Sequence, residues 1–446
     1  MMVLSLSFCT SIYADTKTYS AEEVHNILKR LEVLEKKVKN QEVVVEEIDS
    51  LNERVDDNEF QASMNRIKWG AEFETTVDKV SGQINNSKFN NSNEVSTKLR
   101  LSMESKVNDR TKFTGRLSMY KNWSDSTSNV LTDPAQGRKP IGSSSIFVER
   151  AYVDYRVTDD LVVTVGRQPS SDGPGMSLIE NTKRKSTYPA LLFDGGADGI
   201  VLSYNVAKTN YNPVIRGAYG KGYQENTEYS PLTINSTEIK DLNVYGLFYE
   251  MNIPYNKMGD NLLVISYVHA TDFVGHPQYT DAPNNQNLGD MDLYGIYFEN
   301  NKAFGTKFNY FISLGMNVPD SNGNTVNFGT LTNNQNVSLI KDNGYAFHAG
   351  ARYDYSKEFK FGYEFNHGSK YWYSFTNGST DLLNKLATRG NVNDIYMMYQ
   401  MDMNQFLRIG YTHIDYNYTG SAWHIGKPQE TNDYINRVYL TYNLRF

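Results

Sequence analysis

The chain ends in the stretch RVYLTYNLRF, Arg437–Phe446, whose residues alternate in polarity with a period of two. An extended strand points successive side chains to opposite faces. One face is therefore apolar, with Val438, Leu440, Tyr442, Leu444 and Phe446. The other face carries Arg437, Tyr439, Thr441, Asn443 and Arg445. An apolar face that runs to the last residue is typical of a strand that meets lipid, although an amphipathic edge strand in water would alternate in the same way.

This ending resembles the carboxyl-terminal assembly signal of bacterial outer-membrane proteins. That signal finishes on Phe, with apolar residues two, four and six places earlier. The matching residues here are Tyr442, Leu444 and Phe446, preceded by Leu440. The resemblance implies that the barrel-assembly machinery recognises this end of the chain.

The composition excludes several classes of protein. The 446 residues have a mean hydropathy of −0.56. Because no run of 18 apolar residues occurs, helical membrane spans are not expected. The 33 tyrosines suit the aromatic girdles of a membrane barrel, and they would also suit a carbohydrate-binding β protein. A net charge of −7 argues against nucleic-acid binding.

The amino terminus predicts a secretory leader over residues 1–14. Residues 3–14 are short and largely apolar, and Ala14 is a suitable cleavage site. The usual positive segment is missing, so either the natural start lies upstream or the leader is trimmed. Cys9 is the only cysteine, so no disulfide framework is expected after cleavage. No motif predicts a cofactor or a metal.

Residues 16–64 predict a periplasmic coiled coil. Ser20 and Glu23 have the spacing of a capping box at its start. A seam of residues with 3-4 spacing then continues for over four heptads, which favours self-association. A trimer is favoured only by analogy with barrels of this type. The alternative is a lone amphipathic helix that lies on the barrel or on peptidoglycan. The seam residues are Val24, Ile27, Leu31, Leu34, Val38, Gln41, Val45, Ile48, Asn52 and Val55.

From Trp69 onward, segments with a period of two alternate with polar segments, which predicts about sixteen strands. Several of them, notably 161–168, 241–253 and 261–272, do not show which face is apolar. The predicted strands are 68–77, 97–107, 111–123, 145–157, 161–168, 196–206, 211–221, 241–253, 261–272, 289–301, 305–317, 343–356, 359–367, 392–403, 405–417 and 433–446.

The gaps between these strands alternate between short and long. Short gaps, such as 108–110 and 158–160, lie between long polar ones, which are 79–96, 124–144, 169–195, 222–240, 318–342, 368–391 and 418–432. Short periplasmic turns and long extracellular loops alternate in this way in outer-membrane barrels. We therefore expect a 16-stranded antiparallel transmembrane β-barrel over residues 67–446, in the outer membrane of a Gram-negative cell, with the coil in the periplasm.

Nearly the whole mature chain resembles a general-porin-type barrel with an amino-terminal coiled coil. It is similar to an uncharacterised porin-like family of epsilon-class proteobacteria. The residues that carry the resemblance are 147–155 (FVERAYVDY), 165–169 (VGRQP) and Phe446. The resemblance implies a passive outer-membrane channel for small hydrophilic solutes or ions, with no defined substrate.

Selectivity of such a channel would depend on lumen-facing charges and on a loop that folds inward. The candidate selectivity residues of the strands are Arg100, Glu104, Arg116, Arg150, Asp154, Arg352 and Glu364. Lys183, Arg184 and Lys185 lie in the long segment after the fifth strand, the usual constriction loop of general porins. Lys98, Lys106, Lys112, Lys360 and Arg408 join Asp354 on the predicted inward face, where basic residues outnumber acidic ones. The excess predicts a weak anion preference, and ion pairs within the wall are the alternative.

Two further functions fit the sequence less well. An outer-membrane hydrolase would need a catalytic constellation, and the seven histidines show no metal-ligand spacing, so we expect no enzyme. His413 and Asp415 form a two-residue strand pair of the kind that is usually structural. Alternatively, the coil tethers the envelope, for example through peptidoglycan, and the barrel is its anchor.

Overall fold

A computed structural model describes most of the chain from Ser20 onward. The described residues are 20–26, 28–37, 51, 55, 67–123, 146–168, 172–184, 186–223, 239–253, 260–275, 286–327, 329–332, 334–376, 381 and 383–446. The predicted leader, residue Lys185 and most of the predicted coiled-coil seam lie outside them. The chain divides into two units, Met1–Arg66 and Ile67–Phe446.

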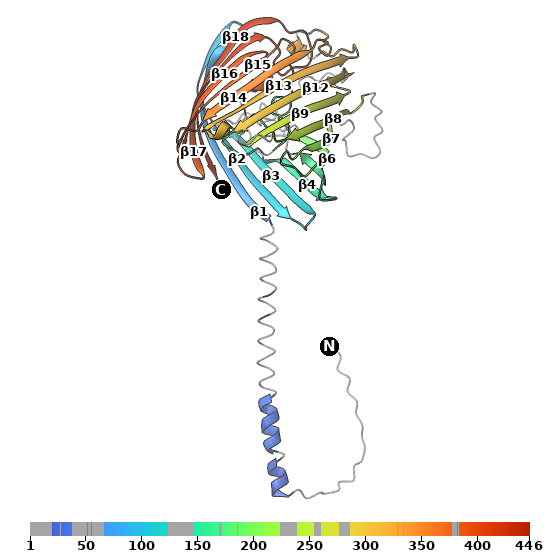
Figure 1. Ribbon diagram of the computed structural model, residues 1–446, viewed down its shortest axis with the longest axis vertical. Coiled ribbons are helices and arrows are strands. Elements are labelled where there is room, and N and C mark those ends of the chain that lie inside the picture. Colours follow the sequence, from blue (N-terminus) through green and yellow to red (C-terminus); the bar gives the residue numbers. More distant parts are fainter. Residues whose placement is uncertain are drawn as a thin grey trace. The chain divides into compact units, whose positions relative to one another are not determined.

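The larger unit is a closed antiparallel barrel of sixteen strands, as predicted (Figure 1). The first strand, β1, pairs with both β2 and the last strand, β18, so the barrel has no free edge. Its strands are β1 (Ile67–Ile84), β2 (Ser87–Lys106), β3 (Thr111–Asn122), β4 (Ile146–Arg156), β5 (Leu161–Gln168), β6 (Ala197–Asn205), β7 (Val214–Tyr223), β8 (Leu242–Met251), β9 (Asp260–Thr271), β12 (Gly289–Asn301), β13 (Phe308–Ser321), β14 (Gly344–Tyr353), β15 (Phe359–Gly368), β16 (Gly390–Gln400), β17 (Gln405–Tyr418) and β18 (Glu430–Arg445).

The connections alternate as the sequence predicts, with one exception. Turns at one end span 107–110, 157–160, 206–213, 252–259, 302–307, 354–358 and 401–404. We call this the short-turn end, and both barrel termini lie there, because Ala71 exchanges backbone hydrogen bonds with Phe446. Connections at the long-loop end include 123–145, 169–196, 224–241, 272–288, 322–343, 369–389 and 419–429.

The exception lies at residues 79–96, where the prediction of a long loop was wrong. Residues 79–84 continue β1 and residues 87–96 begin β2, so only Asn85 and Asn86 form the turn. Both asparagines have positive φ, 50° and 63°, as a two-residue hairpin turn of type I′ requires. The strands were missed because this hairpin carries polar residues on both faces and thus lacks the alternation that marks a strand.

The long-loop end carries a few further elements. A two-stranded sheet joins β10 (Val274–Gly275) to β11 (Gln286–Asn287). Single 3₁₀ turns lie at η3 (Gly329–Thr332) and η4 (Lys385–Ala387), and η2 (Ala303–Gly305) belongs to a short turn.

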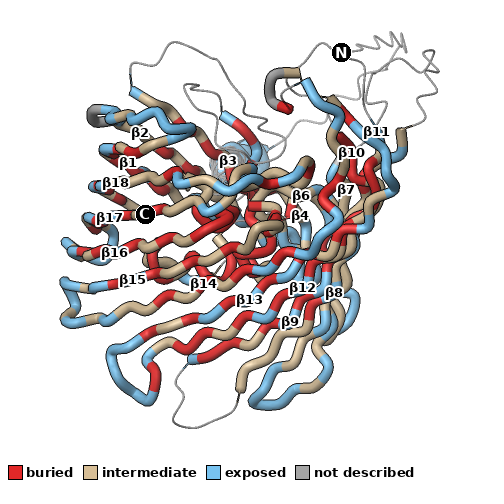
Figure 2. Tube along the Cα trace, turned by 90° about the horizontal axis from the view of Figure 1, so that it is seen from above, coloured by how far each residue is buried: buried red, intermediate tan, exposed pale blue. Residues whose placement is uncertain are grey.

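Burial alternates along the strands, and it distinguishes the two faces of the barrel wall (Figure 2). In β18, Tyr439, Thr441 and Asn443 face inward and are buried, whereas Val438 and Leu440 face outward and are exposed. Exposed aromatic residues mark both ends of the outward face, as lipid interfaces require. They are Tyr219, Tyr245, Tyr267, Tyr294 and Tyr345 nearer the long loops, and Tyr155, Tyr204, Phe308, Tyr353 and Phe359 nearer the short turns.

One strand changes face partway along. The pairing of β4 with β3 shifts between Arg116 and Leu117, so Glu149 forms a β-bulge and both Glu149 and Arg150 are buried. As a result Phe147 faces inward and stacks on Tyr120, with ring centroids 5.8 Å apart. Strict alternation along residues 147–155 would put Phe147 on the lipid face, and the inserted residue at the bulge is the reason that it does not lie there.

In the smaller unit, residues 21–26 and 28–37 are helical. The predicted capping box forms: the backbone amide of Ser20 donates to Glu23 Oε2 at 3.0 Å, and the amide of Glu23 donates to Ser20 Oγ at 3.3 Å. Among the described residues, no helix has the length and apolar character that a membrane crossing needs.

Candidate functional site

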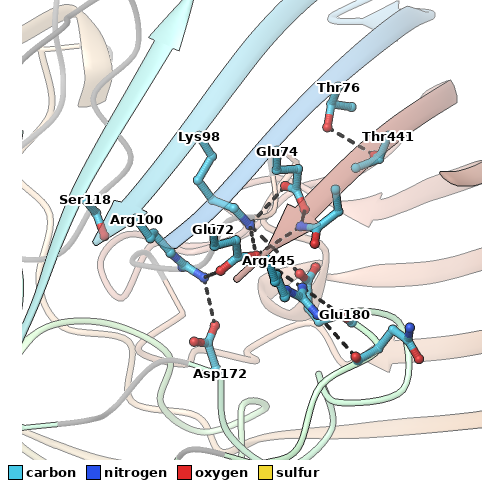
Figure 3. Close-up of polar contacts among 12 residues, drawn as sticks. Glu72, Glu74, Thr76, Lys98, Arg100, Ser118, Asp172, Glu180, Thr441 and Arg445 are labelled. Atoms are coloured by element: carbon cyan, nitrogen blue, oxygen red, sulfur yellow. Dashed lines mark hydrogen bonds and ion pairs between the residues drawn. The ribbon is translucent and has the colours of Figure 1, made fainter. Parts of the chain in front are cut away.

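The candidate site is the barrel lumen, and its main occupant is the loop between β5 and β6. We call residues 169–196 the constriction loop. Its first described residue, Asp172, lies among three inward-facing arginines of the wall, of which Figure 3 shows Arg100. Its carboxylate accepts from Arg100 at 3.4 Å, from Arg116 at 2.6 Å and from Arg150 at 3.1 Å. These contacts fix the start of the loop to β2, β3 and β4.

Two of these arginines share a second carboxylate, on the bulge of β4. Glu149 pairs with Arg100 at 3.2 Å and also with Arg116, and it accepts from the Ser118 hydroxyl. Buried charges are tolerated only when partners and hydrogen bonds compensate for lost hydration. The bulge is therefore what brings enough negative charge to the arginines.

Three more wall arginines hold the middle of the constriction loop by its backbone. Arg352 of β14 donates to the carbonyl of Leu178 at 2.8 Å, and Arg408 of β17 donates to the carbonyl of Ile179. Arg445 of β18 donates to the next two carbonyls, at residues 180 and 181, at 3.0 and 3.2 Å. Four consecutive carbonyls, of which that of Leu178 also accepts from the Asn181 amide at 3.3 Å, are thus bonded by arginines of the wall.

Three carboxylates also converge beside this contact, from Glu72, Glu74 and Glu180. Lys98 Nζ lies 3.5, 3.0 and 3.9 Å from them, and Arg445 lies 3.1 Å from Glu72. The lysine ammonium occupies the position that a metal cation would need, so the group is an ion-pair cluster that joins β1, β2 and the loop (Figure 3).

The described residues of a second loop, 369–376, 381 and 383–389, include further lumen contacts. Lys385 donates to Glu364 and Asp394 at 2.9 Å each. Burial alone would lower the pKa of Lys385, but the two carboxylates outweigh it and raise the pKa well above its ordinary value. The loop pairs with the constriction loop through the bridge of Phe193 to Phe375.

Several predicted selectivity residues therefore contact loops instead of open space. Arg100, Arg116 and Arg150 face inward as expected, and they are buried against Asp172. Glu364 is buried beneath Lys385 and does not line a described cavity. For these residues, ion pairing in the wall describes the contacts better than pore lining does.

Four of the remaining candidates line a cavity of about 1360 Å³ at the short-turn end. Asp154, Lys183, Arg184 and Arg352 line it, and Arg184 pairs with Glu299 at 2.7 Å. Glu104 is exposed at the short-turn end of β2, where it pairs with Lys112 at 2.9 Å.

A second cavity, of about 270 Å³, lies at the long-loop end against β6 to β9. The two cavities share three lining residues, Gln168, Tyr188 and Val201. Tyr188 belongs to the constriction loop, and its ring packs edge-on against Phe248, with centroids 4.8 Å apart. The two cavities therefore meet beside the loop, between Tyr188 and the barrel wall.

The histidine of the His413–Asp415 pair is engaged at both ring nitrogens. Nδ1 lies 2.8 Å from Asn436 and Nε2 lies 3.0 Å from Asp415. His269 and His367 make similar cross-strand contacts, to Asp292 and Asn391. The repetition indicates a structural role, because a catalytic base would need one nitrogen directed at a substrate.

Sequence reasoning missed the residues that position the loops, chiefly Asp172, Glu149 and Lys385. Residues 148–151 (VERA) contain one usable signal for the bulge. Glu149 and Arg150 are adjacent charged residues, and strict alternation allows only one of them to face inward. Asp172 gave none, because its three partners come from three different strands.

Comparison with known proteins places the chain in a family and a fold. OmpF of Salmonella typhi, in a structure titled as a complex with daunomycin, is 12% identical with a TM-score of 0.50, over 85% of this chain and 98% of that one. OprB of Pseudomonas putida is 10% identical with a TM-score of 0.51, over 87% and 96%. No curated protein matches the sequence.

The two structures share the closed barrel fold, and at this identity the likeness concerns the fold alone. One protein-family model matches residues 88–443, which make up most of the barrel. The chain has a porin-like outer-membrane β-barrel fold and belongs to the family described as "Protein of unknown function (DUF3373)".

Proposed function

We propose that the protein is a passive diffusion channel of the outer membrane, with the long loops outside the cell. The observation that carries this proposal is the pair of cavities that meet at Gln168, Tyr188 and Val201. A sixteen-stranded barrel is wide enough to hold an aqueous channel even when a loop occupies part of the lumen.

The route lies between the constriction loop and the wall from β5 to β9. On the other side of the lumen, the loop is fixed by the ion pairs and carbonyl contacts of β2 to β4, β14, β17 and β18. Some of the basic residues that exceed the acidic ones on the inward face are thus already bonded to the loop.

Conductance of the purified protein in planar lipid bilayers tests the proposal. We expect discrete current steps that persist over a range of voltages. A barrel that inserts and conducts no ions would contradict a diffusion channel and would favour the alternative, a membrane anchor for the periplasmic coil.

We further propose a weak preference for small anions, set at the short-turn cavity. Among the described residues, nine basic and six acidic ones line that cavity. The basic residues are Lys106, Arg110, Lys112, Arg156, Lys183, Arg184, Arg216, Lys302 and Arg352, and the acidic ones are Asp109, Asp154, Glu250, Asp260, Glu299 and Asp354. Four of these acidic residues, Asp109, Glu299, Glu250 and Asp354, are neutralised by a basic residue of the same cavity.

The double variant Arg156→Glu with Lys183→Glu is expected to lower the anion-to-cation permeability ratio roughly twofold or more, because it reverses two charges at the cavity wall. The reversal potential in a potassium chloride gradient measures this ratio. Lys357→Glu, in an exposed turn outside the cavity lining, is the control and should leave the ratio unchanged. A wild-type channel that prefers cations would contradict the proposal.

We also propose that residues 16–64 associate with copies of themselves, with a trimer favoured. The described seam residues Val24, Leu31 and Leu34 are 46, 49 and 58% exposed, an apolar stripe that a single helix leaves in water. Attachment to peptidoglycan is the competing role for the coil.

The variant Leu31→Asp with Leu34→Asp is therefore expected to abolish chemical cross-links between chains while conductance persists. The control variant is Lys29→Asp with Lys36→Asp, which changes the heptad position that points away from the seam. It should cross-link like the wild type. If neither variant alters cross-linking but cells lose adhesion between outer membrane and cell wall when residues 16–64 are deleted, the coil is a tether instead.

A further inference from the structure

The cavity at the long-loop end differs in chemistry from the rest of the lumen. Inward positions of β2 and β3 carry Lys98, Arg100 and Arg116, as expected beside charged loops. Inward positions of β7 to β9 carry Ala218, Val244, Phe248, Val268 and Ala270 instead. A lumen wall that only had to admit water would have no reason to be apolar, since apolar surface in water is unfavourable.

Loops complete this apolar wall with aromatic rings in fixed mutual contact. Phe273 stacks on Phe375 with centroids 5.7 Å apart, and Tyr373 meets Phe375 edge-on at 5.3 Å. Trp423 and Phe193 also line the cavity. Ring pairs at these distances are mutually favourable, so the cavity is held open by contacts among its own walls.

One polar group in the cavity lacks a partner. Nε2 of His424 is shielded from solvent and has no hydrogen-bond partner among the described residues. The His424 ring is held by Phe273 and Tyr373, at 5.0 and 5.3 Å. Burial, with Arg389 nearby, lowers the pKa of His424 to about 4, so the ring is neutral at pH 7. A neutral imidazole nitrogen can exchange one hydrogen bond with a ligand. Because Nε2 is covered in this conformation, the ring must turn toward the cavity when it makes that bond.

The charged groups at the cavity are already neutralised. Lys221 pairs with Asp241 at 2.6 Å, and Asp198 pairs with Arg167 at 3.0 Å. A charged ligand would gain little from these pairs and would lose its hydration. The cavity thus favours a neutral molecule.

The volume limits the size of that molecule. A cavity of roughly 150 Å³ holds benzene. A cavity of about 270 Å³ therefore accommodates one aromatic ring with small substituents.

We propose that this cavity binds a small neutral aromatic molecule that carries one hydrogen-bonding group, such as a phenol. The rings of the cavity enclose the ligand, and His424 Nε2 bonds its polar group. This inference assigns a class of solute to the proposed channel. Only the passage of that solute through the barrel rests on the proposed channel function, because binding needs no conduction.

Binding is tested with phenol as the probe on the full-length protein in lipid nanodiscs, by ligand-detected nuclear magnetic resonance against empty nanodiscs. Ala218→Phe fills the cavity from β7, and Gly217→Phe puts the same ring one residue away on the outward face, where nothing lies within 4 Å. We expect saturable binding to the wild type and to Gly217→Phe, and a loss of roughly tenfold or more in affinity for Ala218→Phe. Heat-dependent electrophoretic mobility verifies that both variants form the barrel.

A third variant tests the hydrogen bond and does not alter the wall. His424→Phe keeps a ring of similar shape, so phenol affinity should fall roughly fivefold while toluene affinity stays the same. Phenol signals that match those of empty nanodiscs, or equal affinities for Ala218→Phe and Gly217→Phe, would overturn the inference. Saturable binding by a protein that conducts no ions would refute the channel and leave the binding site standing. Conduction without saturable binding would refute the binding site alone.

Discussion

Replacing Asp172 with alanine is expected to release the start of the constriction loop and to raise single-channel conductance roughly twofold. The variant leaves Arg100, Arg116 and Arg150 buried with Glu149 as their main remaining counter-charge. Breaking a buried ion pair by removing one partner typically costs about 3–5 kcal/mol. The wall strands cannot move without breaking the barrel, so we expect the loop to move and water to reach the arginines.

The measurement combines conductance in planar bilayers with the temperature at which the folded band is lost in electrophoresis. Both should change in Asp172→Ala, with higher conductance and a lower transition temperature. Asp160→Ala is the matched control, since it removes an ion pair with Lys208 at 3.3 Å that lies in the short turns outside the cavity lining, and exposed pairs contribute little. Wild-type conductance in Asp172→Ala would show that Asp172 does not hold the loop in the channel.

Deleting Phe446 is expected to lower the amount of membrane-inserted barrel by roughly tenfold without changing its selectivity. The backbone of Phe446 makes the last hydrogen bonds between β18 and β1, to Ala71 at 2.7 and 3.0 Å. Its side chain is 73% exposed on the outward face, so it adds little to packing inside the barrel. The paired stretch from Glu72–Arg445 to Gln83–Tyr434 remains, and barrels that do close should behave normally.

The folded fraction in isolated outer membranes, separated by heat-dependent mobility, measures this effect. Phe446→Ala separates the aromatic signal from the terminal hydrogen bonds, which it retains. Phe304→Ala, at another outward aromatic residue that is 65% exposed in a short turn, should insert normally. Normal insertion of the deletion variant would exclude Phe446 as an assembly signal for the barrel-assembly machinery.

The strand number was predictable because each strand must present one face to lipid. The alternation of short and long gaps then predicted that successive strands are antiparallel neighbours in the barrel. The hairpin of β1 and β2 was lost because polar residues cover both of its faces, although the pair Asn85–Asn86 is a recognisable turn signal. The bulge at Glu149 required pairing information that one strand does not contain.

The lumen was harder to predict than the wall. Inward-facing arginines could be identified, but their partners on the constriction loop depend on how that loop folds back across the barrel. The apolar cavity did leave a trace in the sequence. Strands 241–253 and 261–272 showed no clear polar face, because Phe248 and Val268 face the lumen while Leu247 and Tyr267 face outward.

The central claim, an aqueous route between the constriction loop and the wall of β5 to β9, is tested most directly by thiol modification during conductance. Ser203 of β6 lines the short-turn cavity, and its neighbour Leu202 is exposed on the outward face. With Cys9 replaced by serine, Ser203→Cys would be the only thiol in the chain. We predict that an anionic methanethiosulfonate reagent, which adds negative charge to the anion-preferring cavity, reduces the current through Ser203→Cys and leaves Leu202→Cys unaffected. A barrel without current, or a current that the reagent does not change at Ser203→Cys, would contradict the account.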